Sequence, residues 1–391
     1  MQNREPISIM IHDLNPWGGQ DRSMLEIAWQ MNKEFPLEIH SYTLDGYQKW
    51  PNMKHVPYQT PIKKPILIKY LIYHIKSWLN LKKKPGKLVQ STGTASLCSD
   101  VVQVQFIHHA WQTWDAQLPK DKSNSGHFLK KMYHWFLKKY KLFLEKKVYT
   151  PKKKYIAISH TIKKELMDHF SIPEDNISII YHGVDGQHFH PWQEDPKARN
   201  TRETLRKNLG IAPTEILLLH VGALNARKGI YKTLQTLALL KKQNFSNLKY
   251  LAVGGGDQKL IEQWIEEFDL KNEVMIASHS KDIRDYYWAA DVFFFPTVYE
   301  PFGLVTLEAM ACGLPVAVSN HAGSSELIED GSNGVLFDPL DSEWEIAQKL
   351  NPLLKDAQYR QQLAERARVT AKEHSWESVG KQYINFYKKQ Y

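Results

Sequence analysis

The sequence predicts an α/β protein built from two doubly wound, parallel-sheet domains, and three features support this prediction. The chain has 391 residues, more than one ordinary hydrophobic core accommodates, so two domains are expected. Short β-rich segments alternate with amphipathic helical segments almost throughout. The β-rich segments are nearly continuous apolar runs, which is typical of parallel strands covered by helices on both faces.

The expected strands fall into two series. The first half of the chain contributes ISIMIH, EIHSYTL, KLVQST, VVQVQFIH, KYIAIS and ISIIYHG, and the second half contributes ILLLHVG, KYLAVGG, EVMIAS, DVFFFP, PVAVSN and GVLFDP. Two such series in tandem indicate two Rossmann-like domains. The polar stretch at 182–200, which contains Gly and Pro, is the expected break between them.

Composition excludes several classes of protein. With 42% hydrophobic and 24% charged residues, the chain is globular, and its two cysteines predict neither a disulfide framework nor a Cys-rich metal site. A reducing, cytoplasmic compartment is therefore expected. ISIMIHDL near the start predicts a buried strand rather than the apolar region of a signal peptide. The longest apolar stretch, 65–81, contains two lysines and a histidine and is too short and too charged to span a bilayer.

Glycine-containing loops follow several of the predicted strands. They are NPWGGQDRS (15–23), VGALNARKG (221–229), VGGGD (253–257) and PTVYEPFG (296–303). Ligands of doubly wound sheets bind at the carboxyl ends of strands, where glycines let backbone N–H groups approach an anion and helix N-termini add positive potential. Together with Arg227 and Lys228, these loops predict a site for a doubly charged phosphate ester. Neither a G-x-G-x-x-G fingerprint nor a P-loop is present.

The segment YEPFGLVTLEAMACG (299–313) brackets one short helix with two carboxylates. Glu300 lies just ahead of a Gly-containing turn, and Glu308 follows eight residues later. Gly303 opens the predicted helix, and Gly313 followed by a proline ends it. An acid near the first turn stabilises a helix by only a few tenths of a kcal/mol, so the fold does not require either carboxylate.

These residues resemble the retaining GT-B glycosyltransferases of glycosyltransferase family 4 (glycosyl transferases group 1), over essentially the whole chain. The most specific match is 300–337, which contains the family's E-x7-E pattern, and VGALNARKG, VGGGD, HGVDGQHFHP and GGQDR support it. The resemblance implies two Rossmann-like domains facing across a cleft. Residues 1–185 plus 375–391 would form the acceptor-side domain, completed by the family's returning terminal helix, and 186–374 the nucleotide-sugar-binding domain.

The resemblance also implies roles for individual residues. Glu308 is similar to the acid that accepts both ribose hydroxyls, and Glu300 is similar to the acid that contacts the sugar ring. Lys228 and Arg227 would stabilise the departing diphosphate, and Glu300 and Lys228 are expected to face solvent. The donor-binding residues implied are Gly18, Gly19, Gly222, Gly254, Gly255, Phe302, Gly303, Leu304, Val305 and Glu308.

His108, at the end of VVQVQFIH, completes the implied catalytic set of Glu300, Lys228, Arg227 and His108, because it is similar to a histidine near the reacting sugar. The adjacent His109 is an alternative for that place. Two positions depart from the family pattern. Ala223 stands where many members carry Arg, and His182 stands where the usual Asn of the N-G-V-D element is found.

The function implied is that of a hexosyltransferase-type enzyme of the EC 2.4 class. It would move a hexose-type sugar from a UDP- or GDP-linked donor to a glycan or a lipid-linked acceptor, as in polysaccharide or lipopolysaccharide biosynthesis. No carboxylate occupies a convincing nucleophile position, so front-face substitution is expected, with catalysis by positioning and charge stabilisation.

No D-x-D motif is present, so neither a metal nor another cofactor is expected. His182, His188 and His190 near Asp185 resemble a metal cluster only weakly. Three function classes stay open: a retaining sugar transferase, a GT-B sugar-nucleotide epimerase or phosphorylase, and a catalytically inactive sugar-nucleotide-binding protein. A phosphorylase would need a pyridoxal lysine and a longer chain. Release of nucleoside diphosphate from UDP- and GDP-sugars would discriminate among them.

Positive charge is concentrated in two stretches of the first half. Residues 62–90 hold eight lysines and no acid, and 127–154 hold ten lysines against Glu145, which is +17 together. Because the formal net charge is +9, the remainder carries about −8. Two interpretations stay open: a solvated lysine face, or a surface drawn to anionic lipid on the inner face of the cytoplasmic membrane. No nucleic-acid recognition motif accompanies the charge, so nucleic acid is not an expected partner.

Overall fold

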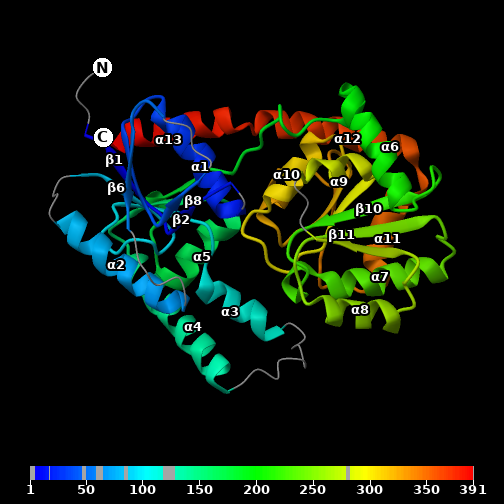
Figure 1. Cartoon of the computed structure of the whole chain (residues 1–391), viewed down its shortest axis with the longest axis horizontal. Coiled ribbons are helices and arrows are strands. Elements are labelled where there is room, and N and C mark those ends of the chain that lie inside the picture. Colours follow the sequence, from blue (N-terminus) through cyan, green and yellow to red (C-terminus); the bar gives the residue numbers. More distant parts are fainter. Residues whose placement is uncertain are drawn as a thin grey trace. The chain divides into compact units, whose positions relative to one another are not determined.

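The computed structural model of the chain describes residues 5–16, 18–45, 50–58, 65–82, 87–117, 128–278 and 282–390. These residues form two compact units, each with its own parallel sheet (Figure 1). The described residues of the first unit fall within Met1–Thr113, Asn124–His182 and Trp376–Tyr391, and those of the second within Trp114–Ser123 and Gly183–Ser375.

The first unit contains a seven-stranded sheet in the order β5-β3-β1-β6-β7-β8-β9, in which every pair is parallel. The strands are β1 (Ile7–Met10), β3 (Leu37–Ser41), β5 (Met53–Pro57), β6 (Val89–Thr92), β7 (Val101–Val104), β8 (Lys154–Ala157) and β9 (Ile177–Ile179). Strands β2 (Asp13–Leu14) and β4 (Thr43–Leu44) form a separate parallel pair. The helices are α1 (Gly19–Asn32), α2 (Ile66–Lys82), α3 (His108–Gln117), α4 (Phe128–Val148), α5 (His160–Phe170), α13 (Trp376–Gln390) and the 3₁₀ turn η1 (Glu174–Asn176). Helix α3 begins in the first unit, and its residues from Trp114 on fall in the second.

The second unit contains a six-stranded parallel sheet in the order β12-β11-β10-β13-β14-β15. The strands are β10 (Ile216–Val221), β11 (Leu248–Val253), β12 (Val274–Ala277), β13 (Val292–Phe295), β14 (Val316–Ser319) and β15 (Val335–Phe337). The helices are α6 (Pro196–Asn208), α7 (Ile230–Lys242), α8 (Gln258–Glu267), α9 (Arg284–Ala289), α10 (Leu304–Ala311), α11 (Glu343–Lys355) and α12 (Ala357–Glu373), with 3₁₀ turns η2 (Trp192–Glu194), η3 (Ala226–Lys228) and η4 (Gly323–Leu327).

Both sheets have the strand order of a doubly wound fold, which reverses direction between the first and fourth strands in sequence. In the second sheet the reversal lies between β10 and β13, whose residues are all buried. The two-domain, parallel-sheet prediction is therefore confirmed, and each strand expected from an apolar run is present. Two details were wrong. The prediction omitted β5, whose residues are mixed and only partly buried, and VVQVQFIH is not one strand because β7 ends at Val104.

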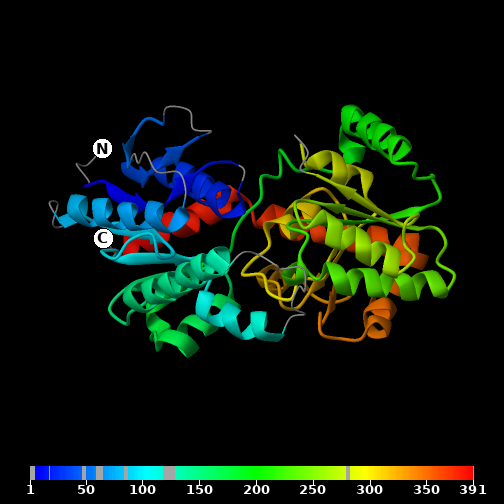
Figure 2. The ribbon, with the colours of Figure 1, turned by 60° about the horizontal axis from the view of Figure 1, so that its bottom comes forward.

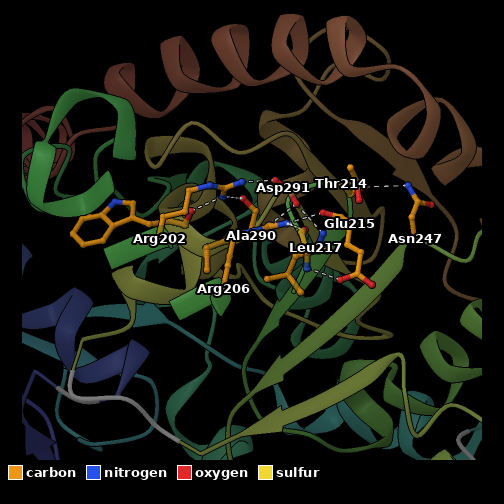
Figure 3. Close-up of polar contacts among 11 residues, drawn as sticks. Arg202, Arg206, Thr214, Glu215, Leu217, Asn247, Ala290 and Asp291 are labelled. Atoms are coloured by element: carbon orange, nitrogen blue, oxygen red, sulfur yellow. Dashed lines mark hydrogen bonds and ion pairs between the residues drawn. The ribbon is translucent and has the colours of Figure 1, made fainter. Parts of the chain in front are cut away.

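Helix α6 is anchored at the edge where the strands of the second sheet begin (Figure 3). Arg202 and Arg206 both contact the carboxylate of Asp291, at 2.6 Å and 2.8 Å. The same carboxylate accepts a hydrogen bond from the backbone N–H of Leu217 at 2.8 Å. Because Asp291 precedes β13 and Leu217 lies in β10, this cluster fixes the two central strands at the edge opposite their carboxyl ends, and it is structural.

The last helix, α13, packs against α1 within the first unit (Figure 2). Its buried Tyr383 hydrogen-bonds the side chain of Gln103 on β7 at 2.7 Å, and the hydroxyl of Tyr387 donates to Gln90 on β6. A Cβ added at Gly380 would lie 2.3 Å from the Cβ of Gln30, so the two helices approach at a glycine. The residues that follow the second unit thus form part of the first unit's core.

Replacing Tyr383 by Phe should destabilise the first unit. The change leaves the fully buried Gln103 amide without its hydroxyl partner, so the free energy of unfolding should fall by about 1–3 kcal/mol in urea titrations. Tyr231→Phe is the control, because that ring packs against Trp264 and Phe268, and its effect should stay within about 0.5 kcal/mol. Equal effects of the two changes would contradict the structural role of α13.

Candidate active site

The loops that follow β10 and β11 pack directly on each other at the carboxyl ends of the strands. The backbone N–H of Gly222 donates to Val253 at 3.0 Å, and that of Leu224 donates to Gly255 at 2.8 Å. A Cβ added at Gly254 would lie 1.8 Å from the carbonyl oxygen of Gly222. No other residue type fits this approach, so Gly254 supports the loop that carries Gly222.

The turn η3 places Arg227 and Lys228 beside the loop that follows β13. Asn225 caps the turn by accepting from the backbone N–H of Lys228 at 3.2 Å. The carbonyl oxygen of Arg227 then accepts from the backbone N–H of Val298 at 2.8 Å and from the hydroxyl of Thr297 at 3.1 Å. The loops on both sides of the strand reversal are thereby joined, and two cations stand at their junction.

Both cations contact one carboxylate oxygen of Glu300. Arg227 Nη1 lies 2.9 Å from Glu300 Oε2 and also 2.9 Å from the carbonyl oxygen of Tyr299, and Lys228 Nζ donates to the same Glu300 oxygen. Lys228 is only 7% exposed, and the Glu300 side chain is 17% exposed. The expectation that these two residues face solvent was therefore wrong, because each is the other's partner in a largely enclosed cluster.

The electrostatics of the cluster follow from burial and from the pairing. Burial raises the pKa of Glu300, but Lys228 and then Arg227 outweigh it and hold that pKa below its ordinary value. Burial lowers the pKa of Lys228, and Glu300 opposes this change. Two cations against one ionised carboxylate leave an excess of one positive charge at the loop junction.

Helix α10 begins next to this ion cluster. Its N-cap, Gly303, has φ +97°, a conformation that favours glycine. A Cβ added there would lie 3.1 Å from the ring of Phe295 and 3.3 Å from Glu300 Cγ. Lys228 Nζ stands 4.7 Å from the centroid of the same Phe295 ring. The positive end of the helix dipole therefore adds to the excess charge of the cluster.

The predicted ligand contacts of α10 lie at different depths. Leu304 and Val305 are half-buried in the first turn, and Phe302 is buried. Glu308 is 3% exposed and accepts a hydrogen bond from the hydroxyl of Tyr287 on α9 at 2.8 Å. Nothing in the sequence pattern indicated Tyr287, because the contact joins residues 21 positions apart on separate helices.

His220, the penultimate residue of β10, lies against the ion cluster and was not predicted. A Cβ added at Gly222 would lie 3.8 Å from His220 Nε2 and 3.9 Å from Lys228 Nζ. Burial, and then the charge of Lys228, lowers the pKa of His220 to about 3. The imidazole is therefore neutral at physiological pH and adds no further charge beside Lys228.

The predicted residues of the first unit lie at two helix starts. Gly18 precedes α1, which begins at Gly19, and the backbone N–H of Gly18 donates to the side chain of Asn15 at 3.2 Å. Asn15 in turn donates to Asp21 at 2.7 Å. Burial, followed by the charge of Asp13, raises the pKa of Asp21 to about 6. The first turn of α1 thus holds a carboxyl group whose pKa lies above its ordinary value.

His108 opens α3 instead of ending a strand, and His109 is the next residue of the same helix. Both imidazoles contact one buried carboxylate, that of Glu145 on α4. His108 Nδ1 lies 3.0 Å from Glu145 Oε1, and His109 Nδ1 lies 2.6 Å from Oε2. In the sequence, Glu145 is distinguished only as the single acid of a lysine-rich stretch.

The structure of the second unit gathers most of the predicted residues of that unit around one point. The group comprises Gly222, Gly254, Gly255, Arg227, Lys228, Glu300, Phe302, Gly303, Leu304 and Val305, with Glu308 further along α10. Gly18, Gly19 and His108 belong to the first unit.

Within the described part of the chain, no three or more His, Cys, Asp or Glu side chains group as a metal site would require. No helix among the described residues has the length and apolarity needed to cross a membrane.

Two family models match successive parts of the chain. Residues 17–188 match the model Glycosyltransferase Family 4, and residues 201–370 match the model Glycosyl transferases group 1. One relative, an uncharacterized glycosyltransferase of Methanocaldococcus jannaschii, is 30% identical over 238 residues. The match spans 60% of this chain and 59% of the relative's own length.

Solved structures share the fold over nearly the whole chain. WaaG, a glycosyltransferase involved in lipopolysaccharide biosynthesis, has a TM-score of 0.76 at 20% identity and covers 97% of this chain and 99% of its own. HepE of Anabaena, solved with UDP and glucose, has a TM-score of 0.74 at 19% identity, covering 99% of this chain and 100% of its own.

The two doubly wound sheets and these structural likenesses place the chain in the GT-B class of folds. Within that class, the two matched models show that the chain belongs to glycosyltransferase family 4, the glycosyl transferases group 1.

A double-mutant cycle should reveal the coupling between Lys228 and Glu300. Lys228→Met leaves Glu300 with Arg227 alone, so the free energy of unfolding at pH 7 should fall by about 1–3 kcal/mol. Adding Glu300→Gln should cost less than the two separate effects summed, by about 0.5–3 kcal/mol. Urea titrations of the four proteins measure both quantities, and strictly additive effects would refute the pairing.

The cost of Lys228→Met should also depend on pH. The cations depress the pKa of Glu300 in the folded state, so their stabilisation is present above the ordinary value of 4.5. This stabilisation is lost as the pH falls through the depressed pKa of Glu300 in the folded state, because a protonated, neutral carboxyl group forms no ion pair with the cations. The difference between wild type and variant should therefore shrink in urea titrations as the pH is lowered from 7 to below 4.5. A difference that stays constant would show that Glu300 is not its source.

Proposed function

We propose that the chain is a retaining, metal-independent glycosyltransferase that transfers a hexose-type sugar from a UDP- or GDP-linked donor to a glycan or lipid-linked acceptor. The observation that carries this proposal is the cluster of Arg227, Lys228 and Glu300 at the start of α10. It combines an excess positive charge, a helix N-terminus and a carboxylate. The positive charge and the helix N-terminus can bind a diphosphate, and the carboxylate can accept hydrogen bonds from the hydroxyl groups of a sugar.

In this proposal the donor diphosphate contacts Arg227 and Lys228 and partly replaces their ion pairs with Glu300. Arg227 and Lys228 stabilise the negative charge that grows on the diphosphate as the glycosidic bond breaks, and the N-terminus of α10 adds its dipole. Glu300, still held by the cations, accepts hydrogen bonds from sugar hydroxyls. The departing phosphate oxygen accepts the proton of the attacking acceptor hydroxyl, so the new bond forms on the face from which the diphosphate leaves.

Glu308 is proposed to hold the ribose of the donor. A carboxylate that accepts from two adjacent hydroxyls needs a fixed orientation, and the hydrogen bond from Tyr287 at 2.8 Å supplies one. The position of Glu308 on the same helix as Gly303 supports one elongated ligand that runs from sugar to nucleoside. The cations and the helix dipole supply the charge stabilisation, so the proposed mechanism needs no metal.

The relatives support a nucleotide-sugar donor in this proposal. HepE was solved with UDP and glucose, and WaaG acts in lipopolysaccharide biosynthesis. We extend the donor class and an envelope-type glycan acceptor to this chain on those grounds. A catalytically inactive sugar-nucleotide-binding protein remains the second candidate, because the same cluster would bind a donor without turning it over.

Calorimetry with UDP and GDP, and release of nucleoside diphosphate from UDP- and GDP-sugars, test the donor site. Glu308→Ala should weaken nucleotide binding by about 1–3 kcal/mol, because the lost hydrogen bonds are charge-assisted. Glu262→Ala, on the exposed face of α8, is the matched control and should bind as wild type does. Absence of binding of either nucleotide at millimolar concentration would sink the proposal, and binding without turnover would favour the inactive protein.

We further propose that the first unit associates with anionic membrane surfaces through α2 and α4. The two helices pack together, since the hydroxyl of Tyr133 accepts from the backbone N–H of Leu67 at 3.2 Å and that of Tyr140 lies 3.1 Å from His74 Nδ1. Their solvent-facing residues include large apolar side chains, namely Ile66, Ile68, Leu71, Ile75, Trp78, Leu79, Met132, Trp135, Phe136 and Phe143.

Lysines surround this apolar surface. Lys139 Nζ lies 5.7 Å from the ring centroid of Trp135, and Lys147 Nζ lies 5.7 Å from that of Phe143. Aromatic rings beside exposed lysines suit the boundary between lipid headgroups and acyl chains. Each lysine near an anionic surface contributes about 1 kcal/mol, so a few in register give measurable binding.

Vesicle co-sedimentation at low and high salt separates the two contributions. Lys138→Gln with Lys139→Gln should reduce the salt-sensitive part, because exposed charges are screened beyond about 8–10 Å at physiological ionic strength. Ile75→Asp with Trp135→Asp should remove the salt-resistant part. Leu340→Asp changes an equally exposed apolar residue of the second unit and should have no effect. Equal binding to neutral and anionic vesicles would defeat the proposal, and salt-sensitive binding to RNA instead would favour a nucleic-acid partner.

A further inference from the structure

Glu145 is a buried carboxylate whose two oxygens are both fully used. Its side chain is 0% exposed, although it lies on α4 among exposed lysines. Oε1 accepts from the backbone N–H of His108 at 2.5 Å and lies 3.0 Å from its Nδ1. Oε2 accepts from the backbone N–H of His109 at 3.1 Å and lies 2.6 Å from its Nδ1. One side chain therefore caps α3 and contacts both imidazoles.

These contacts determine which ring nitrogen carries the proton. An ionised carboxylate only accepts hydrogen bonds, so each Nδ1 that contacts it must carry a hydrogen. Burial raises the pKa of Glu145, but the hydrogen bonds from His108 and His109 outweigh it and hold that pKa below its ordinary value, so the group is ionised. In the neutral rings, Nε2 then carries a lone pair and can accept a hydrogen bond.

The two rings differ in their surroundings. The His108 side chain is 31% exposed and that of His109 18%. The His109 ring is in edge contact with Phe170 at 5.1 Å and lies 6.4 Å from the His169 ring. His108 has Phe106 beside it at 4.9 Å. His109 is thus the more enclosed of the two rings, and the His108 side chain is the more exposed.

We propose that Glu145 is a positioning residue that holds both imidazoles in the Nδ1–H form, and that His108, not His109, offers its Nε2 as an acceptor to a sugar hydroxyl. This inference rests on the proposed transferase function and deepens it by naming the residue behind the histidine. The carboxylate acts on the substrate only through His108. In the same arrangement the adjacent His109 has a structural role, because its ring packs against Phe170 on the buried side of the two imidazoles.

The charged and titratable groups around the pair are compatible with this role. Lys141 lies one turn before Glu145 on α4, where burial lowers its pKa and Glu145 opposes that change. Tyr149 lies one turn after it, and burial, then the charge of Glu145, raises the pKa of that phenol, so it stays neutral. Lys141, Tyr149 and His169 are not anions, so among these groups Glu145 is the anion that both imidazoles contact.

Glu145→Gln is the decisive variant, because it keeps the shape and replaces one acceptor oxygen by an NH₂ donor. One imidazole must then reverse its tautomer to accept from that donor, and its backbone N–H loses its acceptor. Nitrogen-15 NMR of labelled histidine at alkaline pH reports the tautomers without requiring activity. Wild type should show both rings as Nδ1–H, and Glu145→Gln should reverse at least one. An Nε2–H form of His108 in wild type would overturn the proposal.

Kinetics test the link to His108. Glu145→Gln should lower kcat about tenfold or more, the size of one lost hydrogen bond, with the KM for the donor nearly unchanged. His108→Asn should lower kcat at least as much, and His109→Asn much less. In a His108→Asn background, Glu145→Gln should have little further effect on kcat, because both changes remove one function. Multiplying effects, or a larger loss from His109→Asn, would refute the proposed route through His108.

Two controls separate folding from function. If Glu145→Gln lowers the melting temperature, a comparison at a temperature where it is fully folded keeps the kinetic test valid, and Glu377→Gln on the exposed face of α13 should behave as wild type. If wild type transfers no sugar from any donor tried, the proposed function fails, and the NMR result still decides whether Glu145 sets the tautomers. Unchanged tautomers in Glu145→Gln would overturn the positioning role even in an active enzyme.

Discussion

The contact of Lys228 and Arg227 with a single oxygen of Glu300 is the interaction on which the arrangement of loops at the carboxyl ends of the second unit's strands depends. Largely buried charges are tolerated only when they are paired, so the turn η3 and the loop after β13 must stay in register for the cluster to exist. The glycine contact at Gly254 and the left-handed backbone at Gly303 serve the same requirement, since they let two loops and one helix reach a common point. That point lies at the switch in strand order between β10 and β13, which is where doubly wound sheets bind their ligands.

Pairing changes what these side chains can do. Solvent-facing cations would attract any anion and would be screened by salt, whereas enclosed cations are held in place before a ligand arrives and interact with it at a lower effective dielectric. The cost is that the ligand must compete with Glu300 for the cations. That competition favours a ligand that donates hydrogen bonds to Glu300 while its own negative charge contacts the cations. A sugar hydroxyl beside a diphosphate would do both. Under the proposed function, the arrangement would favour the two parts of a nucleotide sugar together over free phosphate.

Patterns local in sequence predicted most of this architecture. Continuous apolar runs identified the central strands, such as β10 and β13, because strands buried on both faces leave little room for polar residues. Glycines at strand ends and the bracketed α10 indicated the residues that converge on Glu300. Edge strand β5 was missed, since its partly exposed residues lack that signature. The pairing of Lys228, the contact of Tyr287 with Glu308 and the two histidines on Glu145 were also missed. Each depends on residues that only the tertiary fold brings together, and no sequence spacing encodes them.

The return of α13 to the first unit has a consequence for how the chain matures. Tyr383 and Tyr387 fill space beneath strands whose own residues are made some 280 positions earlier. During synthesis the first unit therefore lacks the α13 partners of Gln90 and Gln103 until the second unit has been made. The second unit, by contrast, is continuous from Gly183 to Ser375 apart from a short segment that precedes it. Assembly should thus run against the order of translation, the later-made unit being the first to acquire a complete core.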